Sequence, residues 1–196
     1  MTRETLYAEG LALLTRWCVL NGVEAPEVKA WYTDAPFDAC AYYRHGLINI
    51  WPKECSTVGT SPRQWSYPGY VVDRTPYGVL QHELGHHVDE AYNYRGGTYS
   101  SAWREETGEA PLTGYHTNDM EWFAEHFRLF VTNPDLLEKL RPKTWKKLAM
   151  KWPMRAEMRR WEEVLSGAHE RWRQAAINKI QAAKRPSQGA LFHAER

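Results

Sequence analysis

The stretch Tyr77-Gly-Val-Leu-Gln-His-Glu-Leu-Gly-His-His-Val-Asp89 contains an H-E-x-x-H motif at positions 82–86. Residues four apart lie on one face of an α-helix, so His82 and His86 can direct two imidazoles at a single point. Two neutral imidazole nitrogens at this spacing suit Zn²⁺. Glu83 lies about 100° around the helix from His82. It would therefore reach a water on that metal and act as its general base.

The residues around the motif favour a buried helix over a chance match of five letters. Val79, Leu80, Leu84 and Val88 form an apolar stripe at helical spacing. Gly85 has weak helix propensity, and a glycine here predicts that another backbone passes close by. The alternative is a helix that carries two histidines and a glutamate without a metal, because short motifs give false positives.

A second predicted helix, at 118–131, supplies candidates for the third zinc ligand. Two histidines need one more protein ligand if the fourth position is left to water. Glu121 follows His86 by 35 residues, which is ample for the chain to double back. Glu125 lies on the same helix face and can accept the free N–H of a zinc-bound histidine.

Each carboxylate also has a simpler interpretation. Asn118-x-x-Glu121 is a variant of the capping box, and Glu125 is spaced to form an ion pair with Arg128. Aromatic residues surround both glutamates, however, and a pair of buried carboxylates is costly without a metal or a proton donor. We therefore expect Glu121 as the ligand. Asp89, on the histidine face of the first helix, is a further candidate for supporting a ligand histidine.

The two motifs together resemble the catalytic domain of anthrax lethal factor and its relatives. These are zinc peptidases of the gluzincin type, whose smaller members include the Pro-Pro endopeptidases. The resemblance covers positions 78–131 and rests on His82-Glu-Leu-Gly-His-His-Val-Asp89 followed by Tyr115-His-Thr-Asn-Asp-Met-Glu121-Trp-Phe-Ala-Glu125-His-Phe-Arg-Leu129. It implies one zinc ion bound by His82, His86 and Glu121, with Glu83 as the base and Glu125 beside a ligand.

The resemblance also implies a catalytic donor ahead of the ligand glutamate. Tyr115 would donate a hydrogen bond to the oxyanion or protonate the leaving amine. The sequence has one residue fewer between this tyrosine and Glu121 than the toxin pattern, so His116 is the alternative. Such a donor opposite the metal is worth roughly 3 kcal/mol to the transition state.

The substrate is expected on a strand of the region 41–50, which is typical of two strands meeting near His45-Gly46. In related zinc peptidases an edge strand above the metal pairs with an extended peptide, a mode called β-augmentation. We therefore expect Leu47, Ile48, Asn49 and Ile50 to bind the substrate backbone. The alternative is an ordinary core strand.

The complete pattern predicts an α+β, zincin-like fold: a small twisted sheet, an active-site helix, a glutamate helix and a helical C-terminal part. The predicted elements are helices at 2–21, 76–94 and 118–131, a strand at 28–32, a loop at 52–75, a short helix near 103–106 and further helices to about 183. We assign 1–140 to the metallopeptidase core and 141–196 to a basic helical extension, packed on the core or appended to it.

Charge is unevenly distributed along the chain. Positions 141–185 hold 13 Lys and Arg against 4 Asp and Glu, while the whole chain is only +1. This is a solvated helical face or a docking surface for an acidic partner, nucleic acid included.

The cysteines and the N-terminus exclude other classes. Cys18, Cys40 and Cys55 lack C-x-x-C spacing, which argues against a disulfide framework and a cysteine-ligated zinc. Met1-Thr-Arg-Glu-Thr-Leu6 has no signal-peptide pattern, and no apolar run is long enough to span a membrane. We expect a cytoplasmic protein or one delivered by a non-classical route.

The sequence therefore predicts a zinc-dependent endopeptidase that acts on extended peptides or proteins. Two alternatives remain: a metallopeptidase that cleaves repressors to lift immunity, which also pairs H-E-x-x-H with a glutamate helix, and a zinc-bearing binding module with little hydrolytic activity. Glu83 discriminates between enzyme and binding module, because a purely structural zinc site does not need it.

Overall fold

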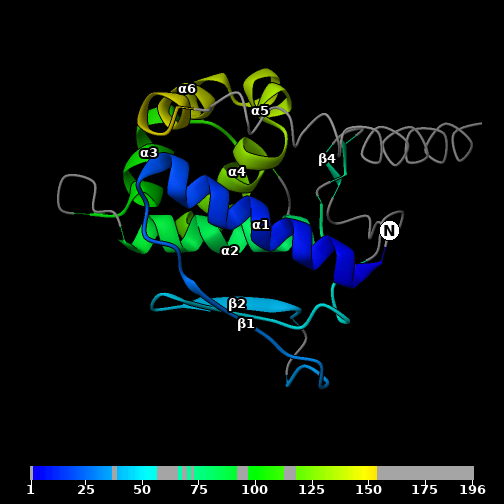
Figure 1. Cartoon of the computed structure of the whole chain (residues 1–196). Helices are drawn as coiled ribbons and strands as arrows, with labels where there is room; N and C mark the ends of the chain where they lie inside the picture. Colours follow the sequence, from blue (N-terminus) through cyan, green and yellow to red (C-terminus); the bar gives the residue numbers. More distant parts are fainter. Residues whose placement is uncertain are drawn as a thin grey trace, which may run out of the picture.

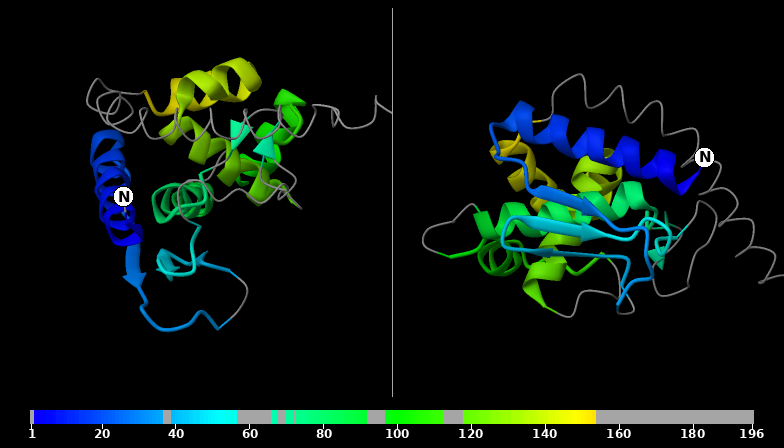
Figure 2. Two further views of the ribbon diagram at one scale, coloured as in Figure 1. Left: turned by 90° about the vertical axis from the view of Figure 1, so that its right-hand side faces the viewer. Right: turned by 60° about the horizontal axis from the view of Figure 1, so that its bottom comes forward.

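The computed structural model describes residues 2–36, 39–56, 66–67, 70–71, 73–91, 97–112 and 118–153. Helix α2 (Pro76–Ala91) lies at the centre of the molecule, between a small sheet on one side and helices α3 to α6 on the other (Figures 1 and 2). Thirteen of its sixteen residues are buried. A helix covered on nearly all sides can carry functional side chains on more than one face.

Helix α1 (Arg3–Asn21) packs along α2. Thr2 caps its first turn by accepting from the Thr5 N–H, and Gly22 ends it in the left-handed conformation, with φ of 64°. The two helices approach closely at Gly10, where a β-carbon would lie 2.8 Å from the Tyr77 Cα. Gln81 ties them together by donating to the Gly10 carbonyl at 2.9 Å. The helix predicted at 2–21 is confirmed.

The main sheet has three strands in the order β1-β3-β2. Strand β1 (Glu27–Ala30) runs parallel to β3 (Leu47–Ile50), and β2 (Ala41–Arg44) pairs with β3 antiparallel. The β2–β3 hairpin turns at His45 and Gly46, whose φ angles of 46° and 80° are typical of a type I′ turn. The hairpin is therefore as predicted, whereas β1 begins one residue earlier and ends two residues earlier than expected.

The central position of β3 corrects the predicted substrate strand. Both edges of β3 are already bonded, to β1 and to β2, and Ile48 and Ile50 are fully buried. Leu47, Ile48, Asn49 and Ile50 therefore form a core strand, and the prediction that they pair with a peptide is wrong. The sequence did not show that β1 would pair with β3 and leave β2, the strand between them in the sequence, at the edge.

Helix α4 (Asp119–Thr132) crosses α2. Asn118 caps it by accepting from the Glu121 N–H at 2.9 Å. Gly85 of α2 faces Ala124 of α4, and a β-carbon on Gly85 would lie 2.8 Å from the Ala124 Cα. The backbone that Gly85 predicted is thus the second helix of the candidate site.

The remaining helices close the core on the other side of α4. They are α3 (Tyr99–Thr107), α5 (Pro134–Leu140) and α6 (Pro142–Lys151), and a short hairpin pairs β4 (Ser66–Tyr67) with β5 (Tyr70–Val71). The Trp152 ring, directly after α6, lies 5.9 Å from that of Trp17 and 6.0 Å from that of Phe127. The first helix of the predicted 141–196 extension is thus packed on the core, and 154–196 lie outside the described residues. No helix in the described part of the chain is long and apolar enough to cross a membrane.

Candidate metal centre

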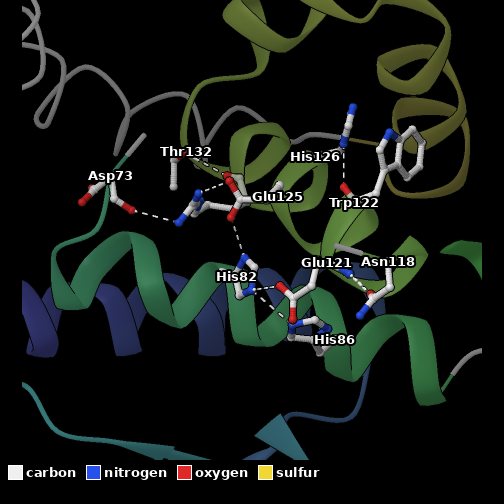
Figure 3. Close-up of polar contacts among 10 residues, drawn as sticks. Asp73, His82, His86, Asn118, Glu121, Trp122, Glu125, His126 and Thr132 are labelled. Carbon is white, nitrogen blue, oxygen red and sulfur yellow. Dashed lines mark hydrogen bonds and ion pairs between the residues drawn. The ribbon is translucent and has the colours of Figure 1, made fainter. Parts of the chain in front are cut away.

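The crossing of α2 and α4 brings His82, His86 and Glu121 to one point (Figure 3). The Nε2 atoms of the two histidines lie 3.1 Å apart. The Glu121 carboxylate places Oε2 3.1 Å from His82 Nε2 and Oε1 3.6 Å from His86 Nε2. Ligand atoms 2.0–2.2 Å from a tetrahedral zinc lie about 3.3 Å from one another. The spacing and the donor types therefore fit Zn²⁺, with two imidazoles and one carboxylate as ligands.

Glu125 faces the other nitrogen of His82. Its Oε1 atom lies 2.8 Å from His82 Nδ1, and its side chain is only 2% exposed. A neutral His82 that donates Nδ1–H to this carboxylate carries its lone pair on Nε2, the atom that faces His86 and Glu121. The arrangement therefore matches the prediction that Glu121 belongs to the ligand group and that Glu125 supports a histidine.

Charges in this centre shift the pKa values of its members when no metal is bound. Burial lowers the pKa of His82, but hydrogen bonds to Glu121 and Glu125 outweigh this effect and raise the pKa to about 9. Burial raises the pKa of Glu121, but hydrogen bonds from His82 and His86 outweigh it and hold that pKa well below its usual range. A proton on His82 thus takes the place of a cation among these carboxylates.

Glu83 lies beside the ligand group, close enough for the charges of His82, His86 and Glu121 to act on it. It is 6% exposed, and its carboxylate lies within reach of the Tyr43 backbone N–H in strand β2. Burial raises the pKa of Glu83, while the positive charges of His82 and His86 oppose that rise. A buried carboxylate of raised pKa next to a metal site is suited to accepting a proton.

Tyr43 links strand β2 to helix α2 through its side-chain contacts. Its hydroxyl accepts from the Gly46 N–H at 2.8 Å and lies 3.3 Å from His87 Nδ1. His87 Nε2 also lies 2.8 Å from the Glu24 carbonyl, so this third histidine of the motif region packs toward the sheet and is not part of the candidate ligand group. The sequence pattern of a hairpin indicates which face of the sheet each side chain lies on. It does not show which helix residue a strand residue will contact.

Asp89 forms a bond that the sequence did not predict. It is 3% exposed, and its Oδ1 atom accepts from the Ser100 backbone N–H at 2.8 Å. Ser100 is in the first turn of α3, whose own N-cap residue, Thr98, makes no side-chain cap bond. Asp89 therefore caps α3 from α2. The charge of His86 also acts on its carboxylate, and the support of a ligand histidine by Asp89 stays a prediction.

The catalytic donor and most of the basic region fall outside what the structure describes. Tyr115 and His116 both belong to the segment 113–117, and residues 154–185 hold most of the predicted docking surface. Two basic residues of α6 have internal partners: Lys143 Nζ donates to the Thr107 carbonyl at 3.0 Å, and Lys147 pairs with Glu106.

Comparisons with protein-family models, with curated proteins and with solved structures find no match to this chain. The account of its function therefore depends on the geometry of the centre and on the motifs that produce it.

Proposed function

We propose that the chain is a zinc-dependent endopeptidase with the zincin type of fold. The observation that carries the proposal is the position of Glu83. This residue is next to His82 in the sequence but outside the ligand group, and its buried carboxylate lies close to the backbone of strand β2. A purely structural zinc site has no need of a buried carboxylate that lies beside the ligand group and close to the unpaired edge of a strand.

Each residue of the centre has a defined task in peptide hydrolysis. His82, His86 and Glu121 would hold a zinc ion, which would supply a Lewis acid and a water of lowered pKa. Glu83 takes the proton of the attacking water on its carboxylate and delivers it to the leaving nitrogen. The Tyr43 N–H orients that carboxylate. Tyr115 or His116, in agreement with the resemblance, donates to the oxyanion.

Strand β2 is the edge that offers backbone groups to a substrate. The Trp51 N–H donates to the Cys40 carbonyl at 2.8 Å, so the alternating pattern of an antiparallel pair directs residues 42 and 44 toward β3. The backbone groups of Ala41 and Tyr43 then face outward. Among the described strands none pairs with this edge. An extended peptide that binds here would run past the carboxylate of Glu83.

A cavity of about 460 Å³ lies at the Cys40 end of this edge. The residues that line it include two acidic ones, Asp34 and Glu54, and one basic one, Arg74. Whichever carboxylate Arg74 neutralises, these three side chains retain a net charge of −1. The cavity is large enough for a long side chain, and we assign it to a basic residue of a peptide lying on β2.

A peptide library incubated with and without chelator tests the function. Wild-type protein should cleave internal bonds, and chelator should abolish cleavage. Glu83→Gln should lower the rate by about 10²- to 10⁴-fold while retaining zinc, whereas Glu105→Gln, on the exposed surface of α3, should cleave like the wild type. Uncleaved peptides under every condition would favour the zinc-bearing binding module, and cleavage confined to a DNA-binding repressor would favour the immunity-type peptidase.

A further inference from the structure

We propose that Arg128 is a positioning residue of the metal centre, which fixes His82 by acting through Glu125. The inference rests on the proposed function, since it concerns the same metal site. Arg128 follows Glu125 by three residues on α4, and both side chains are almost completely buried, at 5% and 2% exposure. A buried guanidinium and a buried carboxylate each need a partner, because either charge left alone would be strongly destabilising.

The two oxygens of Glu125 are occupied by different partners (Figure 3). Oε2 is bonded to the guanidinium of Arg128, and Oε1 lies 2.8 Å from His82 Nδ1. A carboxylate has only one rotation about its last bond, so a partner on one oxygen determines where the other oxygen lies. The Arg128 contact therefore sets the direction in which Glu125 presents Oε1 to the histidine.

The guanidinium is itself anchored outside α4. Its Nη1 atom donates to the Asp73 carbonyl at 3.2 Å. Asp73 is held in turn by its own carboxylate, which accepts from the Thr75 N–H at 2.8 Å and from the Thr75 hydroxyl at 2.7 Å. The Asp73 carbonyl also lies against α2 at Gly78, where a β-carbon would be 2.3 Å from that oxygen.

These contacts form a closed path around one turn of α2. Gly78 and His82 are four residues apart on that helix, and the path Asp73–Arg128–Glu125 connects the Gly78 level with the His82 ring. Both ends of the path are thus fixed to the helix that carries the ligand. An Arg128–Glu125 ion pair without the other contacts would only stabilise α4. The path also determines the tautomer and the ring orientation of His82.

Arg141 provides a matched control for the loss of a buried guanidinium. It is 7% exposed and its guanidinium donates to backbone carbonyls, at 2.6 Å for Pro111 and with a further bond to Ala110. It lies at the junction of α5 and α6, and these bonds connect it to the segment that follows α3. Replacing Arg141 therefore removes a buried cation without touching His82 or Glu125.

The experiment compares the zinc affinity of the full chain in Arg128→Met and Arg141→Met, by competition with a chromophoric chelator. Arg128→Met should weaken zinc binding about 10- to 100-fold, the usual effect of losing a group that orients a ligand, and should change the visible absorption of the Co²⁺-substituted protein. Arg141→Met should lower the melting temperature but leave affinity and spectrum unchanged. If Arg128→Met does not fold, Arg128→Gln is measured instead, with the same expected loss.

A double variant tests whether Arg128 acts through Glu125. Arg128→Met combined with Glu125→Gln should weaken zinc binding no more than Glu125→Gln alone, because the path is already broken. Wild-type affinity in Arg128→Met, or losses that multiply in the double variant, would overturn the inference and leave the proposed function intact. A wild-type chain that binds no zinc would instead contradict the proposed function itself.

Discussion

Gly85 of α2 and Ala124 of α4 are in contact at the point where the two helices of the candidate metal centre cross. A β-carbon at position 85 would lie 2.8 Å from the Ala124 Cα and 3.2 Å from the Phe127 Cβ. Because these are a backbone atom and the root of a packed ring, neither can move aside by a rotamer change. The absence of a side chain at Gly85 therefore sets the distance between His82 and Glu121.

Gly85→Ala should separate the helices despite the better helix propensity of alanine. In an open helix this change would stabilise by about 1 kcal/mol. Here overpacking should destabilise the fold by about 1–3 kcal/mol and weaken zinc binding at the same time. Urea denaturation and zinc titration measure the two effects. A variant at least as stable as the wild type, with unchanged zinc affinity, would show that the crossing is looser than described.

Asp89→Ala should affect stability but not the metal. Its carboxylate caps α3, and loss of such a cap costs about 1 kcal/mol. Asp89→Asn retains an acceptor oxygen and should lose less. Thermal denaturation gives the stability and a zinc titration gives the affinity. A loss of zinc affinity comparable to that of Glu125→Gln would instead support the predicted role of Asp89 beside a ligand histidine.

Proline scanning of β2 distinguishes the two sides of the strand. Ala41→Pro removes an N–H that faces outward, so the sheet should tolerate it while the KM for peptides rises. Tyr42→Pro removes an N–H bonded to β3 and should instead destabilise the fold. The KM for peptides and the free energy of unfolding are measured for both variants, so that each variant is the control for the other. An unchanged KM in a folded Ala41→Pro would argue against substrate pairing on this edge.

The metal-free protein should become less stable as the pH rises above neutrality. His82 has a pKa raised from 6.5 to about 9 in the folded chain, because burial, which lowers it, is outweighed by Glu121 and Glu125. Its contribution is therefore complete below pH 6.5 and lost as the pH approaches 9. Glu121, whose pKa is lowered from 4.5, contributes above pH 4.5 and loses its effect in more acidic solution.

Urea denaturation in excess chelator measures this profile. The free energy of unfolding should fall by on the order of 3 kcal/mol between pH 6.5 and 9, since each pKa unit corresponds to about 1.4 kcal/mol. His82→Gln should remove most of that fall. A profile of the wild type that stays flat from pH 6.5 to 9 would contradict the proposed coupling between His82 and the two glutamates.

The helices of the centre could be predicted because their signals are local. His82, His86, Glu121 and Glu125 follow from helical spacing, and Gly85 indicated the close approach of α4. The capping interpretation of Asn118 was also correct, since the cap uses the backbone of Glu121 and leaves its carboxylate for the histidines.

Tertiary contacts explain what could not be predicted. The order β1-β3-β2 depends on a parallel pairing between segments seventeen or more residues apart, and no local pattern specifies which strand becomes the edge. The link from Arg128 to Asp73 joins residues 55 positions apart. Asp89 lies on the expected helix face, but the unfilled N-terminus of α3 competes for its carboxylate.

The zinc content of protein purified without chelators tests the central claim most directly. Wild type and Glu83→Gln should each contain about one zinc per chain, because the one ligand group among the described residues holds one ion, and Glu121→Ala should contain far less. Absence of zinc from the wild type, or equal zinc in all three proteins, would contradict a metal centre built from His82, His86 and Glu121.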